Sequence, residues 1–231
     1  MSRHIAIVSA TTKEIQPLLD YLKAEASQHE FQTYKLHALT IDIIYSGIGI
    51  LQTTYNLMDY LSHRHPDAWI QAGIGGAFDH SLNIGDVYQI ESEVLVEFGA
   101  EDFDGRIIDP FELGWNDPNG FPYTEGKLIC PFINEKFELP IASGMTSIHA
   151  HGFPPHIEQL RTGINGQIEN MEGAVFFYIS LIKKIPFLSL RSVSNFVEAR
   201  DTKKWNFGLS LKNLNDTIIG IIKSEKIPHA I

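Results

Sequence analysis

Two short polar segments carry side chains whose types could hold one ligand between them. Residues 170–173 (Asn-Met-Glu-Gly) precede an apolar helix, and residues 191–195 (Arg-Ser-Val-Ser-Asn) end an apolar strand. Strand ends and helix starts are where an open α/β sheet presents side chains to a ligand, and backbone N–H groups keep a carboxylate at a helix start ionised. An anionic acceptor, Glu172, and a neutral amide, Asn195, are thus expected on one rim. That pair suits a polyol such as ribose beside a hydrogen-bonding heterocycle such as a purine.

A second carboxylate, Glu14, follows the first apolar run of the chain after a short turn. One interpretation is a solvated acid at a helix start, which the helix dipole favours. The functional alternative is a general base that deprotonates water, and the residues alone leave both open. A functional role is indicated more strongly for Glu172. The helix after it is apolar nearly all round, so Glu172 is expected to be buried, and a buried carboxylate needs partners to stay charged. Arg191 could be that partner.

Two glycine-rich segments follow predicted strands, at residues 73–76 and 46–49. The first fails the dinucleotide fingerprint, because Phe78 stands at the sixth position and no helix clearly starts inside it. It predicts either a tight strand exit without a ligand or a backbone platform against a flat heterocycle. The second fits a plain turn. Neither segment offers an arginine, the usual partner of a bound phosphate.

Three histidines, His149, His151 and His156, flank a Gly-Phe-Pro-Pro sequence. A histidine pair in a loop can bind zinc, but no carboxylate or cysteine stands at ligand spacing. We therefore expect a loop that lines a pocket, and no metal site.

Composition narrows the class of protein. The chain has 231 residues, 44% of them hydrophobic and 20% charged, and a net charge of −10, which disfavours nucleic acid or an anionic membrane as a partner. The single cysteine, Cys130, cannot form an internal disulfide. No signal peptide or membrane span is expected, and a reducing cytoplasm is the expected compartment.

Strands alternate with helices along the chain, which predicts an α/β layer fold with a largely parallel sheet. We expect one domain over residues 1–231, with an ordered, aromatic-rich excursion at about 98–127. Strands are predicted at 4–9, 41–45, 68–72, 86–97, 141–147, 167–171 and 187–194, and helices at about 13–22, 51–63, 155–161, 172–184 and 209–223.

Taken in order, these segments resemble the nucleoside phosphorylase/hydrolase superfamily of the purine phosphorylase type. The chain is most similar to the methylthioadenosine/S-adenosylhomocysteine (MTA/SAH) nucleosidases and, within that neighbourhood, to the futalosine hydrolases. The superfamily resemblance rests on residues 5–14, 73–76, 84–87, 170–173 and 191–195, and the futalosine branch on residues 99–102, 111–114 and 194–200. It implies a single-domain fold with a mixed, partly barrelled sheet flanked by helices.

The resemblance also implies residue roles. Glu14 would activate water, and Glu172 would accept hydrogen bonds from the ribose hydroxyls while stabilising an oxocarbenium-like sugar. Met171 would pack against the sugar and Phe153 would flank the base. The other implied substrate contacts are Gly75, Gly76, Asn170 and Ser194.

At Asn195 the chain departs from the adenine-specific nucleosidases, which carry an aspartic acid that protonates the purine N7. An amide is no general acid, but it presents both a donor and an acceptor. A 6-oxopurine leaves as an oxygen-stabilised anion, which a carboxylate would repel. The resemblance therefore implies hydrolysis of futalosine to hypoxanthine and dehypoxanthine futalosine, in menaquinone biosynthesis.

It further implies no metal or organic cofactor, a small-molecule nucleoside as the partner, and a homo-oligomer of at least two chains. Three alternatives stay open: an MTA/SAH nucleosidase, a purine nucleoside phosphorylase, and a non-catalytic nucleoside-binding protein. The missing phosphate arginines disfavour the phosphorylase. In the binding protein, Glu14 would be only a helix-start acid.

Overall fold

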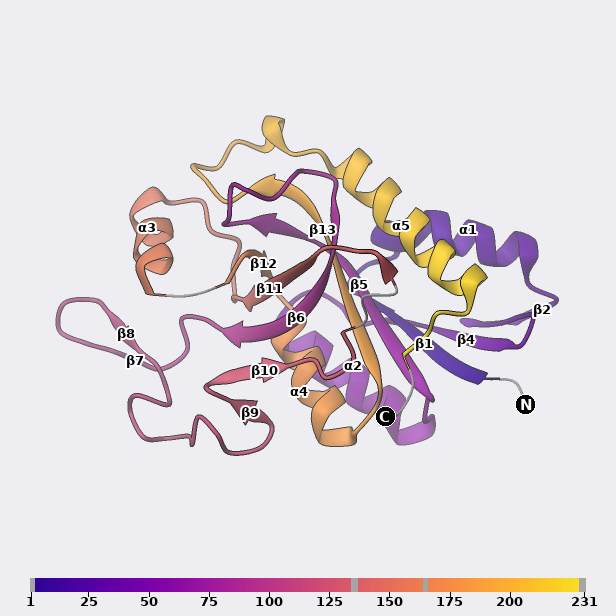
Figure 1. Ribbon diagram of the computed structural model, residues 1–231, viewed down its shortest axis with the longest axis horizontal. Coiled ribbons are helices and arrows are strands. Elements are labelled where there is room, and N and C mark those ends of the chain that lie inside the picture. Colours follow the sequence, from indigo (N-terminus) through magenta and orange to yellow (C-terminus); the bar gives the residue numbers. More distant parts are fainter. Residues whose placement is uncertain (1–2, 134–136, 164–165, 229–231) are drawn as a thin grey trace.

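The computed structural model describes residues 3–133, 137–163 and 166–228, and within them helices pack on both sides of a twisted sheet (Figure 1). The strands are β1 Arg3–Ser9, β2 Gln28–Glu30, β3 Thr33–Leu36, β4 Leu39–Tyr45, β5 Ala68–Ala77, β6 Val87–Leu95, β7 Ala100–Glu101, β8 Ile107–Ile108, β9 Tyr123–Thr124, β10 Lys127–Ile129, β11 Ile141–Thr146, β12 Ile168–Asn170 and β13 Phe187–Phe196. The helices are α1 Gln16–Glu25, α2 Gly49–His63, α3 Pro154–Gly163, α4 Gly173–Lys183 and α5 Phe207–Ser224, with short 3-10 turns η1 Thr12–Ile15 and η3 Thr202–Lys204.

The described strands form a mixed sheet that closes on itself in part. The order is β2-β3-β4-β1-β5-β12-β11-β6-β10-β9, and β13 pairs with both β5 and β6. Because β13 joins β5 to β6, the strands β5, β12, β11, β6 and β13 make a closed ring. β1, β4, β5 and β13 run parallel to one another, whereas β12 is antiparallel to β5 and β13 is antiparallel to β6. The expected mixed, partly barrelled α/β fold is confirmed.

Alternation along β1 explains how the two helical layers attach. Ile5 and Ile7 belong to the core under α1 and α5, while Ala6 and Val8 belong to the core under α2 and α4. Successive side chains of a strand point to opposite faces, so an almost uninterrupted apolar strand buries both faces at once. The strand ends, where the polar residues begin, are therefore held between two packed layers.

Two local predictions were wrong, and one hairpin was missed. β5 runs on through residues 73–76, which were expected to form a loop, because β13 and β12 pair with it there. Glu14 lies in the 3-10 turn η1, and the first α-helix begins only at Gln16. The hairpin of β2 and β3 was not predicted. The segment 98–127 includes the β7–β8 hairpin and β9, at the lower left of Figure 1.

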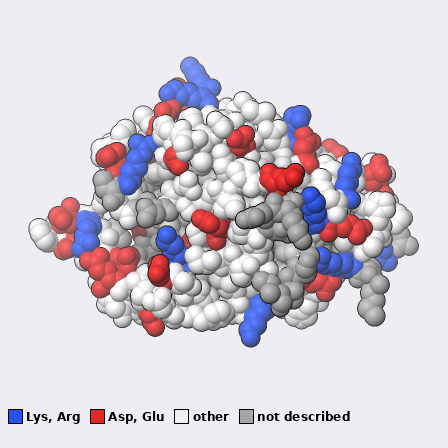
Figure 2. Space-filling model, in the orientation of Figure 1, with Lys and Arg blue, Asp and Glu red and all other residues white. Residues whose placement is uncertain are grey.

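Charge is spread over the surface. On the face in Figure 2, lysine and arginine side chains stand singly among acidic ones and form no continuous basic area. Among the described residues, no helix combines the length and the hydropathy that crossing a membrane requires.

Candidate active site

The carboxylate of Glu172 is the centre of the site. Glu172 is the N-cap residue of α4 and is 8% exposed. Its Oε1 accepts a hydrogen bond of 2.9 Å from the backbone N–H of Gly49, and its Oε2 lies 3.9 Å from Nη2 of Arg191. Gly49 has a φ of +80°, which glycine adopts without strain. The turn at 46–49 therefore supplies a donor to Glu172, a role that the plain-turn interpretation missed.

Behind Glu172, a buried network fixes its position. The Oδ1 of Asn170 accepts the N–H of Glu172 at 3.1 Å and that of Gly173 at 2.6 Å, and it lies 3.4 Å from Nη2 of Arg191. The Nδ2 of Asn170 donates to Oε1 of Glu93 at 2.7 Å. Both ends of the Asn170 amide are thus engaged by protein, so this residue orients the start of α4.

Glu93 is a buried acid that the sequence did not single out. It is 0% exposed, lies on β6, and accepts a hydrogen bond of 2.9 Å from Thr146 as well as the one from Asn170. A Cβ added to Gly173 would come within 2.0 Å of its carboxylate. Glycine at position 173 therefore leaves room for the carboxylate of Glu93 directly behind the start of α4.

Burial governs the protonation of both acids. Burial raises the pKa of Glu93 to about 7, although the charge of Arg191 and the bonds from Thr146 and Asn170 pull it down. Burial also raises the pKa of Glu172; Arg191 and the Gly49 N–H oppose this, and the negative charge of Glu14 adds to it. A cation placed near Glu172 would relieve this cost, because an opposite charge favours the ionised form.

Glu14 faces the same region from the end of β1. Its Oε2 accepts hydrogen bonds from the N–H and the hydroxyl of Thr11, at 2.9 and 3.1 Å, and from the Ser9 hydroxyl at 3.3 Å. Its Oε1 lies 3.3 Å from the N–H of Ile74. The side chain is only half-buried. Glu14 is thus held in a fixed orientation while keeping access to solvent.

Gly73 shows how closely the charged groups approach one another. A Cβ at this position would lie 2.2 Å from Nη1 of Arg191 and 3.3 Å from Oε1 of Glu14. Arg191 in turn lies beside Glu172. The turn after β1, the middle of β5 and of β13, and the start of α4 therefore bring two carboxylates and one guanidinium together, as the sequence predicted for Glu172 and Arg191.

The glycines at 75 and 76 are explained by side chains that pack on them. A Cβ at Gly75 would lie 2.5 Å from the side chain of Ile168, and a Cβ at Gly76 would lie 2.9 Å from Val197 and 3.2 Å from Nδ2 of Asn195. The absence of side chains permits close packing of β5 against β12 and β13. Contact of this backbone with a base stays a prediction.

Asn195 stands next to this glycine strand, on β13. Its Oδ1 accepts a hydrogen bond of 2.8 Å from the hydroxyl of Ser194, and its Nδ2 donates to the carbonyl of Phe196 at 2.9 Å. Ser194 also bonds the carbonyl of Gly75 at 3.1 Å. A primary amide has two N–H groups and two acceptor lone pairs. Asn195 therefore retains one donor and one acceptor for a ligand.

Two of the expected contacts lie at the rim. Phe153, at the start of α3, is 58% exposed, and its ring packs edge-on against His156 at 5.1 Å between centroids. Met171 is half-buried beside Glu172. An exposed aromatic ring and a flexible thioether are suitable for contacting a ligand, and their contacts with one remain predictions.

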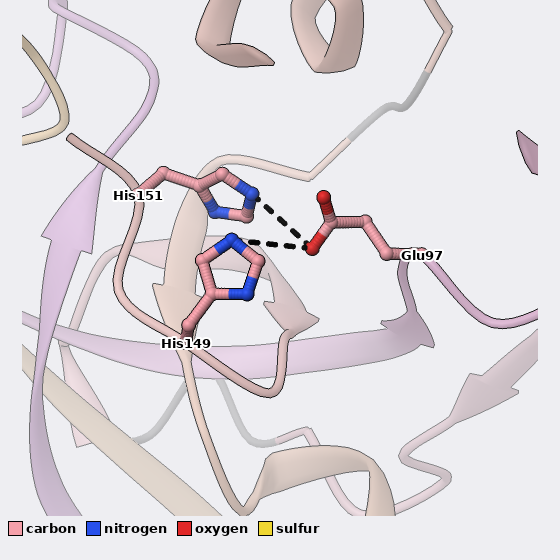
Figure 3. A group of neighbouring side chains, drawn as sticks. All are labelled: Glu97, His149 and His151. Carbon is pink, nitrogen blue, oxygen red and sulfur yellow. Dashed lines mark ion pairs between the residues drawn. The ribbon is translucent and has the colours of Figure 1, made fainter. Parts of the chain in front are cut away.

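In the sequence no carboxylate stands at ligand spacing from the histidines, but the fold brings one to them. Glu97, which follows β6, lies 3.3 Å from Nε2 of His151 and 3.6 Å from Nε2 of His149 (Figure 3). The other ring nitrogen of His151 contacts Glu169. Burial lowers the pKa of His151, but Glu169 and Glu97 raise it more. His156 stands apart, against Phe153.

This arrangement can carry out chemistry on a sugar. Glu14, with its access to solvent, can take a proton from water, and buried Glu172 can accept hydrogen bonds from hydroxyls and stabilise a developing positive charge. Paired carboxylates with these two roles are typical of glycosidic bond hydrolysis. The donor and acceptor of Asn195 fit the edge of a heterocycle.

Known proteins resemble the chain over most of its length, although no family model matches it. It is 28% identical over 207 residues to a 5'-methylthioadenosine/S-adenosylhomocysteine nucleosidase of Maridesulfovibrio salexigens, with 84% of this chain and 86% of that one covered. It is 24% identical over 226 residues to a futalosine hydrolase of Streptomyces coelicolor, with 93% of each covered. Its fold matches the native structure of futalosine hydrolase from Helicobacter pylori with a TM-score of 0.75 at 16% identity, over 97% of this chain and 99% of that one.

These similarities support the superfamily that the motifs indicated, and both branch names occur among the relatives. By sequence and by fold, the chain is therefore similar to the MTA/SAH nucleosidase-like proteins of the nucleoside phosphorylase/hydrolase superfamily.

Proposed function

We propose that this protein hydrolyses the N-glycosidic bond of a purine nucleoside. The observation that carries the proposal is the convergence of Glu14 and Glu172 around Gly73 and Arg191, with one acid half-exposed and the other buried. Relatives of both branch names are N-ribosyl hydrolases, which agrees with this chemistry.

In the proposed reaction, Glu14 takes a proton from a water molecule while the oxygen of that water bonds to C1′ of the ribose. The C1′–N9 bond breaks, and its electron pair leaves with the purine, which then takes up a proton. Positive charge develops on the ribose ring in between. Glu172, ionised and close to Arg191, accepts hydrogen bonds from the ribose hydroxyls and stabilises that charge, because preorganised charge in a buried site acts strongly.

We further propose futalosine as the substrate, with hypoxanthine and dehypoxanthine futalosine as products, a step of menaquinone biosynthesis. Support comes from the amide at position 195, whose free N–H can donate to O6 of a 6-oxopurine as negative charge builds there. A relative named futalosine hydrolase covers 93% of the chain. Gly75, Gly76, Met171 and Phe153 are the proposed contacts of the base and the sugar.

The alternatives predict different products. An MTA/SAH nucleosidase would release adenine from methylthioadenosine, and a purine nucleoside phosphorylase would need phosphate and yield a sugar 1-phosphate. A nucleoside-binding protein would turn over nothing. The competing functions can be compared by measuring base release from futalosine, inosine and methylthioadenosine, each with and without phosphate. The proposal requires hypoxanthine from futalosine without phosphate; preferential adenine release or phosphate dependence would reject it.

We also propose that a second copy of the chain packs against α2. Ile48, Leu51, Tyr55 and Met58 are 57%, 86%, 70% and 40% exposed, and they recur at helical spacing. Gly49, at the start of the same helix, binds Glu172, so this apolar stripe begins at the edge of the site. Contiguous exposed apolar surface is typical of an interface.

Sedimentation velocity tests this assembly. Leu51→Glu should shift the protein from dimer to monomer, whereas Phe103→Glu, a similarly exposed position on the β7–β8 hairpin, should leave it dimeric. A wild-type monomer would disprove the proposed assembly without affecting the proposed hydrolysis.

A further inference from the structure

A group of metal-ligating side chains lies outside the proposed catalytic residues, where the end of β6 meets the loop between β11 and α3 (Figure 3). Glu97, His149 and His151 each offer one ligand atom, and these atoms all lie within 4.8 Å of one another. We propose that these three residues bind a divalent transition-metal ion of the zinc class. Glu169 would orient His151 within this site.

The two distances from Glu97 fit such an ion, and the two histidine nitrogens lie within 4.8 Å of each other. In a tetrahedral zinc site with bonds of about 2.0–2.1 Å, neighbouring ligand atoms lie about 3.3 Å apart. The Oε2 of Glu97 is 3.3 Å from Nε2 of His151 and 3.6 Å from Nε2 of His149. Two imidazoles and one carboxylate form the ligand set of several zinc sites, and such a set leaves a fourth position for water.

Unsatisfied buried atoms provide the second observation. The side chain of His151 is 1% exposed, yet its Nε2 has no hydrogen-bond partner, and neither has Oε2 of Glu97. The two atoms lie 3.3 Å apart as an ion pair that is charged only when His151 carries a proton, and a bound metal ion would take the place of that proton. Buried polar atoms without partners cost free energy, and a metal ion between them would satisfy both.

The surroundings of His151 are those of a metal ligand. Its Nδ1 contacts a carboxylate oxygen of Glu169, and its backbone N–H lies 3.2 Å from the other oxygen. Histidine ligands commonly donate their second ring N–H to a carboxylate, which fixes the tautomer that exposes Nε2 to the metal. A divalent ion would also balance the charges of Glu97 and Glu169 in this buried place.

The ion would tie the end of β6 to the loop that leads into Phe153. The pairing of β6 with β11 already brings these two segments side by side, and the ion would add a crosslink between their side chains. We therefore expect metal binding to raise the unfolding temperature, because a ligand that binds only the folded state stabilises it by mass action.

Metal titration of the full chain, prepared without a polyhistidine tag and freed of metal with a chelator, tests the proposal. With ZnCl2 we expect one ion per chain and a higher Tm, and with CoCl2 the strong visible absorption of a four-coordinate site. Glu97→Gln and His149→Ala should each weaken zinc binding at least tenfold, and Glu169→Gln by about 10- to 100-fold. His156→Ala, a control from the first turn of α3 just after the loop, should bind zinc like the wild type.

Glu97→Gln is the decisive variant, because Glu97 is partly exposed and the amide preserves the shape of the carboxylate, so the variant should fold. Absence of saturable binding, or equal binding by wild type and the Glu97→Gln and His149→Ala variants, would overturn the proposal. So would an equal loss in His156→Ala. None of these measurements depends on a nucleoside, so the metal site and the proposed hydrolysis stand or fall separately.

Discussion

The two ends of the candidate active site differ in how firmly protein bonds hold their side chains. At the end proposed for the ribose, Glu172 is bonded by Gly49, lies near Arg191 and is supported from behind by Asn170 and Glu93. At the end proposed for the base, the amide of Asn195 bonds only Ser194 and Phe196 among the contacts described, and keeps one donor and one acceptor free.

We expect the ribose end to determine the rate of bond cleavage and the base end to determine which purine is accepted. A preorganised charge at the ribose end needs no reorganisation when the oxocarbenium-like sugar forms, and such preorganisation is often the largest contribution to catalysis. Free hydrogen-bonding capacity at the base end discriminates between purines, because an unmatched partner would be left unpaired. Substitutions at the first end should therefore affect every substrate, and substitutions at the second should affect substrates unequally.

The largest effect is expected for Glu14→Gln. Loss of the general base should lower kcat about 10²- to 10⁴-fold for futalosine and inosine alike, with nucleoside binding largely kept. Initial rates and equilibrium binding of each nucleoside measure the two properties. A variant that retains more than about a tenth of the wild-type kcat would remove Glu14 from its role.

Arg191→Met should mainly cost stability. It would leave the buried acids Glu172 and Glu93 without their cation, and breaking a buried ion pair costs about 3–5 kcal/mol of unfolding free energy. Urea unfolding at pH 7 measures this. The control is Arg106→Met, whose partner Glu112 is exposed and which should unfold like the wild type. If both variants unfold like the wild type, Arg191 does not hold the site together.

Asn195→Asp should separate the two ends most clearly. Loss of the amide donor and repulsion at O6 should lower kcat/KM for the hypoxanthine nucleoside by about 5- to 150-fold, which corresponds to about 1–3 kcal/mol for a lost buried hydrogen bond. The loss for any adenine analogue should be smaller. Parallel assays on futalosine and methylthioadenosine give the comparison. Equal losses on both substrates would show that position 195 does not distinguish the bases.

A smaller effect concerns pH. The proposed reaction requires ionised Glu172, and burial, the largest cause, raises the pKa of this carboxyl above its ordinary value of 4.5. The ionised fraction, and with it kcat/KM, should therefore fall as pH decreases through a value above 4.5, before unfolding begins. Circular dichroism at each pH controls for unfolding. A pH profile that stays flat down to pH 4.5 would contradict the proposed role of ionised Glu172.

The sequence predicted this site best where local pattern and chemistry agree. An acid at the start of an apolar helix, followed by a strand that contains an arginine, predicted Glu172 and Arg191 as neighbours, and they are. Arg191 nevertheless lies in the middle of β13, beside Gly73 of β5, and not at a strand end, so the order of elements predicted the neighbour but not its place in the strand. The place of Asn195 on the same rim stays a prediction. The prediction failed at residues 73–76, because pairing with β12 and β13 extends β5 through glycines that favour loops on their own.

Other groups near the site could not be predicted from the residues around them in the sequence. Glu93 lies in a strand with acids on either side of Ser92, where nothing in the sequence distinguishes the buried acid from the exposed one. The donor from Gly49 is a backbone N–H, which residue type does not reveal. Glu97 approaches His149 and His151 only because the sheet brings the end of β6 beside the loop after β11, so the histidine spacing alone could not predict a carboxylate there.

Hydrolysis of futalosine in water enriched in ¹⁸O, without phosphate, tests the central claim most directly. If Glu14 activates water for attack on C1′, mass spectrometry of the products at early times should find one ¹⁸O in dehypoxanthine futalosine and none in hypoxanthine, and Glu14→Gln should largely abolish this turnover. No turnover without phosphate, or a sugar 1-phosphate as the product when phosphate is added, would contradict the account.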